Sequence, residues 1–102
     1  VVRAASLTLL VMLMGACARE REPGAGIADP QARAQALIES GNQAFRAGNY
    51  GLAARRYAAA ATYRKDDPAA YYGMGMALSK LGRDEEARRA YARARELSQG
   101  KP

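Results

Sequence analysis

The only thiol in this sequence is Cys17, in a chain that has no histidine. A lone cysteine cannot close a disulfide within its own chain. Without histidine, neither a Cys/His nucleophile pair nor an ordinary zinc site can form. We therefore expect no catalytic residue, no metal and no cofactor, and the chain is predicted not to be an enzyme. What Cys17 can still do is carry a covalent modification or pack as a small apolar side chain.

The residues around Cys17 favour the modification. Arg3 is followed by fifteen uncharged residues, "AASLTLLVMLMGACA". A membrane-spanning helix needs about 20 apolar residues, so this segment is short for a permanent span. A basic start, an apolar run from Leu7 to Met14 and the small residues Gly15 and Ala16 are typical of an export signal.

The stretch "LMGAC", residues 13–17, resembles the lipobox of bacterial lipoproteins. The resemblance implies that residues 1–16 are removed and that Cys17 becomes a lipidated first residue, which anchors firmly because it carries several acyl chains. Ala18 follows the cysteine at the position where lipoproteins that are retained in the inner membrane have Asp. The resemblance therefore implies passage to the outer membrane. We expect an outer-membrane lipoprotein on the periplasmic face of a bacterial cell envelope.

Two alternatives for this segment remain open. "ACA" (residues 16–18) is also an A-x-A cleavage site, and cutting after it would release a soluble periplasmic protein. In the other alternative, residues 4–18 form a buried helix that contains Cys17. The next stretch, "AREREPGAGIAD", is broken by Pro23 and two glycines, so residues 17–29 are predicted to be a lipidated cysteine with a flexible linker.

The formal charge of +6 raises the question of a nucleic-acid partner. However, acidic residues are interleaved with the arginines, as in "RDEEARR", and no block of like charge is long. This pattern is typical of solvated helix faces. We therefore expect no nucleic acid among the partners.

The rest of the chain repeats itself after 34 residues, so that Gly41 pairs with Gly75, Gly48 with Gly82 and Tyr57 with Tyr91. Asp29-Pro30 and Asp67-Pro68 each combine an N-cap side chain with a proline in the first helical turn. Gly48 and Gly82 are placed to end those helices in the left-handed conformation. Second helices are predicted to begin near Gly51 and Asp84 and to run to about Tyr63 and Ser98.

Small residues are expected where the two helices of each hairpin cross, with Gly41 against Ala53 and Gly75 against Ala87. The rings of Tyr57 and Tyr91 are expected to fill the space between hairpins.

The period and its residues resemble the tetratricopeptide repeat. The residues that carry the resemblance are Leu37, Ser40, Gly41, Ala44, Ala53 and Tyr57 in the first unit, and Tyr71, Met74, Gly75, Leu78, Ala87 and Tyr91 in the second. The resemblance implies an all-α fold, in which two helix-turn-helix repeats (30–64 and 65–98) stack as a short α-solenoid over residues 30–98. Residues 99–102 are a tail.

The family's first helices line a surface that binds partner peptides. The positions that resemble this groove are Ile38, Asn42, Phe45, Arg46, Tyr72, Met76, Ser79 and Lys80. An apolar strip with a basic edge suits a segment that carries acidic residues. An equally open interpretation is that Phe45 and Met76 belong to the core at the hairpin seam.

The resemblances together imply a membrane-anchored adaptor or assembly factor that binds a protein or peptide in the envelope. The alternative is a soluble periplasmic binding or chaperone-like module. Because two repeats are few for a solenoid, we also expect that the open side of the last helix associates with a second copy or is stabilised by the partner.

Overall fold

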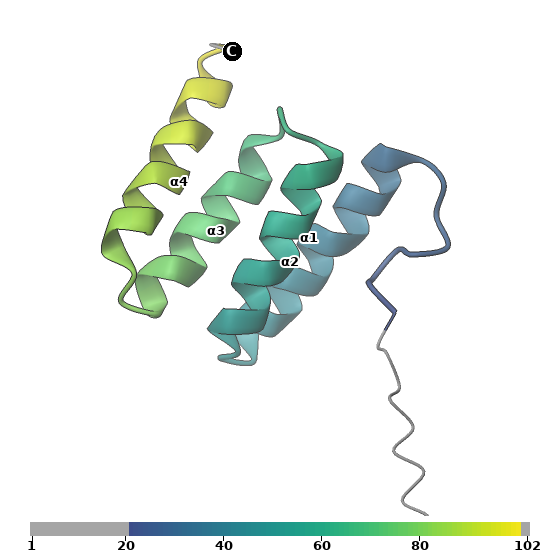
Figure 1. The fold of residues 1–102 in the computed structure, drawn as a ribbon, viewed down its shortest axis with the longest axis horizontal. Coiled ribbons are helices and arrows are strands. Elements are labelled where there is room, and N and C mark those ends of the chain that lie inside the picture. Colours follow the sequence, from purple (N-terminus) through teal and green to yellow (C-terminus); the bar gives the residue numbers. More distant parts are fainter. Residues whose placement is uncertain (1–20, 101–102) are drawn as a thin grey trace, which may run out of the picture.

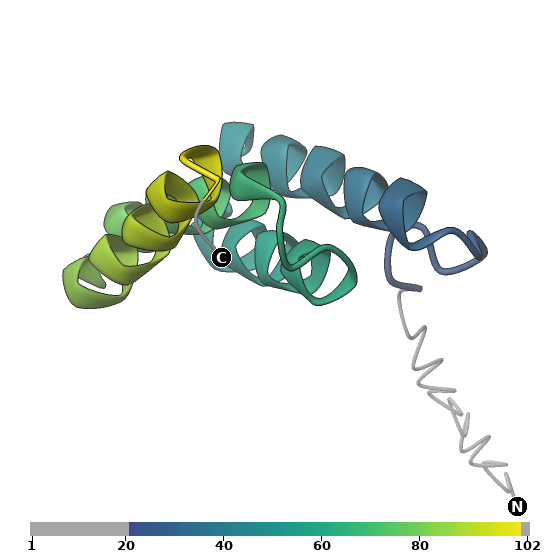
Figure 2. The same cartoon turned by 90° about the horizontal axis from the view of Figure 1, so that it is seen from above.

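The computed structural model describes residues 21–100, which form four α-helices: α1 (Pro30–Arg46), α2 (Tyr50–Tyr63), α3 (Pro68–Lys80) and α4 (Asp84–Ser98). α1 and α2 make one antiparallel hairpin, α3 and α4 make the other, and α3 contacts both helices of the first (Figure 1). Seen from above, α1 lies over α2, and the second hairpin follows to one side (Figure 2). The predicted all-α stack of two helix hairpins is confirmed. None of the helices in residues 21–100 is long and apolar enough to cross a bilayer.

The helices begin and end where local chemistry predicts. The Asp29 carboxylate accepts the Ala32 amide at 3.0 Å, the Asp67 carboxylate accepts the Ala69 amide at 2.9 Å, and a proline follows each aspartate. Gly48 and Gly82 have φ angles of +76° and +74°, as a left-handed helix C-terminus requires. The predicted boundaries of both first helices are therefore confirmed.

The core is built largely from alanine, and its largest fully buried side chains are Leu37 and Tyr57. Because alanine side chains fill little volume, a larger side chain is needed between the helices, and the Tyr57 ring of α2 lies there against Gly41 of α1 and Gly73 of α3. Gly41 and Gly75, the glycines predicted to let the two helices of each hairpin approach closely, each lie against a tyrosine ring. A Cβ on Gly41 would lie only 2.8 Å from the Tyr57 ring, and one on Gly75 only 2.7 Å from the Tyr91 ring.

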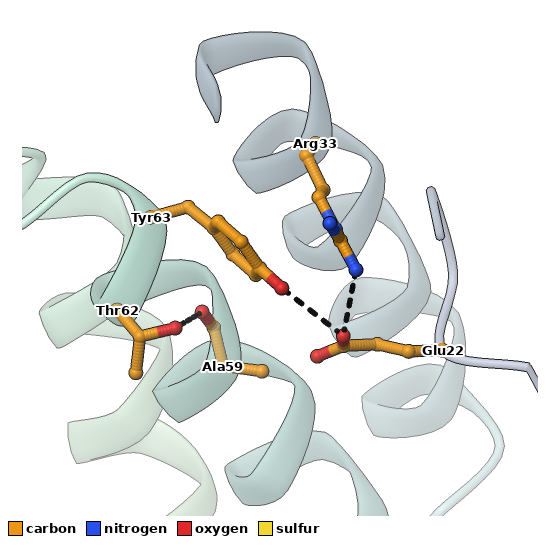
Figure 3. A network of polar contacts seen from close by, with 5 residues as sticks. All are labelled: Glu22, Arg33, Ala59, Thr62 and Tyr63. Carbon is orange, nitrogen blue, oxygen red and sulfur yellow. Dashed lines mark hydrogen bonds and ion pairs between the residues drawn. The ribbon is translucent and has the colours of Figure 1, made fainter. Parts of the chain in front are cut away.

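The described part of the expected linker, residues 21–29, is not free of contacts. Two turns fold it back onto the start of α1, and the Glu22 carboxylate lies 3.5 Å from the Arg33 guanidinium (Figure 3). The same carboxylate accepts a hydrogen bond from the Tyr63 hydroxyl at 3.3 Å, and Arg33 lies over the Tyr63 ring. Glu22 therefore ties this segment to α1 and α2. Cys17 and the expected signal sequence lie outside the described residues.

Candidate functional site

A cavity of about 540 Å³ opens between α1, α3 and the C-terminal end of α4, and we call it the α1/α3 cavity. Its lining consists of Ile38, Asn42, Tyr57, Pro68, Ala69, Tyr72, Gly73, Met76, Ala94, Arg95, Ser98 and Gln99. The volume is in the range of sites that hold small molecules or side chains of a bound peptide.

Tyr57 forms the floor of the α1/α3 cavity. Its ring lies between Gly41 of α1 and Gly73 of α3, so close that a Cβ on Gly73 would be 2.5 Å from the ring. The Tyr57 hydroxyl donates a hydrogen bond to the side-chain amide oxygen Oδ1 of Asn42 at 2.5 Å. Burial raises the pKa of the Tyr57 hydroxyl, and the positive charge of Arg46 offsets part of that rise. The floor is therefore a fixed side chain with its polar atom already satisfied.

The wall on the α3 side is apolar and exposed. Tyr72 is 56% exposed, a large value for an aromatic side chain. Its ring meets the ring of Tyr91 edge to face, with centroids 5.4 Å apart. Met76 lines the cavity one helical turn further along α3. Tyr72 is thus held in place by Tyr91 and still presents most of its surface to solvent.

Charged groups give the cavity a positive edge. Arg95 of α4 lines it. The positive charge of Arg46 lies near enough to Tyr57 to offset part of the rise in the pKa of the Tyr57 hydroxyl. None of the residues that line the α1/α3 cavity is Asp or Glu. A ligand with an apolar group and a carboxylate would fit this combination of surface and charge.

The structure brings four of the predicted groove residues together. Ile38, Asn42, Tyr72 and Met76 all line the α1/α3 cavity. Arg46 and Lys80 are exposed in the last turns of α1 and α3, and Ser79 is exposed beside Lys80. These three residues and Phe45 are not part of the lining.

Phe45 packs against the core, and its ring meets that of Tyr50 at a centroid distance of 5.1 Å. This is the packing expected from the interpretation in which Phe45 belongs to the hairpin seam.

Sequence reasoning missed the contribution of α4. Ala94, Arg95, Ser98 and Gln99 reach the α1/α3 cavity because α4 runs antiparallel to α3, so its last turns lie beside the start of α3. The predicted hairpin could have indicated this contribution. The two helices of a hairpin are antiparallel, so the end of α4 must lie near the start of α3, which Pro68 marks.

A sequence profile of the tetratricopeptide repeat family matches residues 44–102. Searches of curated proteins and of solved structures found no significant match. The matched region contains α2, α3 and α4, and the structure adds α1 as the partner of α2 in the same hairpin geometry. The chain therefore belongs to the tetratricopeptide repeat family, whose repeats form non-enzymatic scaffolds that generally mediate protein–protein interactions.

Proposed function

We propose that this protein is a lipid-anchored adaptor of the bacterial cell envelope, which binds a segment of a partner protein in the α1/α3 cavity. The observation that carries the binding role is Tyr72, a large aromatic side chain that is 56% exposed at the mouth of a cavity of about 540 Å³. Aromatic side chains in such positions are the usual anchors of protein interfaces. Arg46 and Arg95 favour a segment with a carboxylate near its apolar anchor.

The anchoring part of the proposal is supported by the sequence around Cys17. The stretch "LMGAC" follows an apolar segment of the length and flanks that export signals have. Five residue steps separate Cys17 from Glu22, so the extended chain spans at most about 18 Å between them. Since Glu22 is held by Arg33 and Tyr63, a lipid on Cys17 would keep the helical module close to the bilayer.

Site-directed photo-cross-linking in a bacterial host tests the binding site. A photoreactive phenylalanine analogue at position 72 should cross-link to an envelope protein. The same analogue at Arg55, on the surface between α2 and α3 away from the cavity, should not. Tyr72→Ala should weaken binding of the captured partner by about 1–3 kcal/mol while the helical signal is kept. Equal cross-linking at both positions would contradict the assignment of the cavity.

Intact mass spectrometry of the mature protein tests the anchor. Lipidation predicts an N-terminus at Cys17 that carries acyl mass, and Cys17→Ala should accumulate as an uncleaved precursor. An unmodified N-terminus at Arg19 would contradict the anchor. It would indicate the soluble periplasmic module that cleavage after "ACA" produces.

A further inference from the structure

The outward side of α4 has no helix packed against it among the described residues (Figure 1). The corresponding side of α2 is covered by α3, so the two helices can be compared. α4 repeats α2 at a distance of 34 residues, so Ala54, Tyr57 and Ala61 correspond to Arg88, Tyr91 and Arg95. In α2, Tyr57 and Ala61 are 1% and 9% exposed, and Ala54 is partly buried against the cluster that contains Leu78 of α3. These positions therefore define the surface that a neighbouring helix covers.

In α4 the two alanines are replaced by arginines around the same tyrosine. Arg88, Arg89, Tyr91, Ala92 and Arg95 line a hollow of about 390 Å³, which we call the α4 end surface. Glu85 is the only acidic group paired with them in the described residues, at 3.5 Å from Arg88 and 3.9 Å from Arg89. Arg95 has no ion pair within residues 21–100. The surface is therefore strongly basic, with an apolar ring at its centre.

The packing of Tyr57 indicates the shape of an occupant. α3 can cover Tyr57 because it presents Gly73 to the ring, where a Cβ would be only 2.5 Å away. Tyr91 already rests on Gly75 on its inner side, as Tyr57 rests on Gly41. A helix that covers Tyr91 in the same register needs a glycine at the corresponding point, and other helices would be held at a distance by the ring.

The Tyr91 hydroxyl also differs from that of Tyr57. Met76 stands where the first unit has Asn42, the acceptor of the Tyr57 hydroxyl. A thioether is a weak acceptor, and the Tyr91 hydroxyl donates no hydrogen bond to any residue in the range 21–100. An oxygen acceptor from outside would complete this group.

We propose that the α4 end surface binds an acidic helix of another protein, which presents a glycine to the Tyr91 ring and carboxylates to Arg88 and Arg95. Charge decides against a second copy, because an α4-to-α4 contact would bring arginines against arginines.

The α4 end surface adjoins the α1/α3 cavity, because Arg95 lines both and the Tyr91 ring meets that of Tyr72. Arg95 lies on the edge between the two surfaces, whereas Arg88 belongs to the α4 end surface alone and Met76 to the cavity alone. Substitution of Arg88 therefore tests this proposal, and substitution of Met76 tests the proposed cavity function.

α3 supplies the probe. A hydrocarbon-stapled helical peptide with the 13-residue sequence of α3 is prepared in four versions. The first is the parent sequence, the second carries Ala70→Glu and Met74→Glu, the third carries lysine at both positions, and the fourth adds Gly73→Leu to the glutamate version. Binding to the full chain in detergent is measured by titration calorimetry.

The glutamate peptide should bind at least about tenfold more tightly than the lysine peptide, with an affinity that falls as salt is added. Gly73→Leu in that peptide should abolish binding, because the leucine meets the Tyr91 ring.

The matched protein variant is Arg88→Ala/Arg95→Ala, which gives α4 the alanines that α2 has at the same positions. It should lose the preference for the glutamate peptide and bind the parent peptide instead. Arg55→Ala/Lys65→Ala, with the same charge change elsewhere, should keep the wild-type preference, and Met76→Ala should keep it too.

Three results would overturn the proposal. Equal binding of the glutamate and lysine peptides would show that charge does not select the occupant. Absence of binding by all four peptides would show that the arginines only keep the end of the solenoid soluble. A dimer of the wild-type chain in sedimentation, lost in Arg88→Ala, would assign the surface to a second copy.

Discussion

Tyr57 is the residue on which the packing of this small protein depends. Its ring replaces the volume that an alanine-rich core lacks, and it can do so because Gly41 and Gly73 have no side chains. The same ring forms the floor of the α1/α3 cavity, so stability and the shape of the site share one side chain. Glycine inside a helix normally weakens it by about 0.5–1 kcal/mol relative to alanine. At these two positions the close approach of the ring reverses that preference.

Gly73→Ala should therefore destabilise the fold, although alanine favours helices. Its Cβ would lie 2.5 Å from the buried Tyr57 ring, so the ring or the helix must shift, and overpacking of this kind costs about 1–3 kcal/mol. Gly51→Ala is the control, because the nearest atom to its Cβ is an exposed arginine nitrogen at 3.7 Å. It should leave the free energy of unfolding unchanged or raise it by up to about 1 kcal/mol. Urea unfolding measures both, and equal effects would contradict the packing role of Tyr57.

Because of the Tyr57 hydroxyl, the free energy of unfolding should also change with pH in the alkaline range. Burial raises the pKa of this group above its ordinary value near 10, with a partial opposing effect of Arg46. The unfolded chain therefore loses the proton at lower pH than the folded protein does. The stabilisation of the folded state that this group contributes is present in full below about pH 10 and is lost as the pH rises through the pKa of the folded protein. Unfolding free energies between pH 9 and 11.5 should fall more steeply for the wild type than for Tyr57→Phe, and parallel curves would contradict this.

At the scale of helices, the sequence predicted what local chemistry determines and missed what tertiary contacts determine. Asp29, Asp67, Gly48 and Gly82 act within a few residues of themselves, and the helix ends that they predict are confirmed. Apolar spacing alone does not predict burial at the end of a helix. Leu81 continues the apolar spacing of α3, but it lies at the end of that helix and is 42% exposed. The place of Arg95 in the cavity depends on the antiparallel return of α4, which residue spacing within one helix does not encode.

The two neighbouring aspartates before α3 allow a direct test of capping. Asp67→Ala removes the hydrogen bond to the Ala69 amide and should lower the free energy of unfolding by about 1 kcal/mol. Asp66→Ala removes the same charge. Its side chain is 81% exposed and lies 3.8 Å from Arg64, so it should change stability by well under 0.5 kcal/mol. If thermal unfolding showed equal losses, the effect would belong to charge and not to the cap.

The part of the molecule that the structure describes, residues 21–100, has two unlike ends. At one end residues 21–29 fold back on α1, and Glu22 holds them through Arg33 and Tyr63 (Figure 3). At the other end α4 packs on α3 alone among the described helices, and it presents arginines where α2 has the partly buried Ala54 and the buried Ala61. In a stack of repeats, stability comes from each unit and from its interfaces with neighbours. A helix with one interface is therefore held less firmly than α2 or α3, which are packed on both sides.

Native-state hydrogen exchange should reveal this difference. Backbone amides of α4 are expected to exchange at least about tenfold faster than those of α2 and α3, which corresponds to a local opening about 1.4 kcal/mol cheaper than unfolding of the centre. Glu22→Ala should accelerate exchange in α1 and leave α4 unchanged, because the carboxylate contacts only the first hairpin. Addition of the glutamate version of the α3 peptide should slow exchange in α4 selectively, since a bound helix gives α4 its second interface. Uniform protection across all four helices would show that the two hairpins open as one unit and that the open end carries no stability cost.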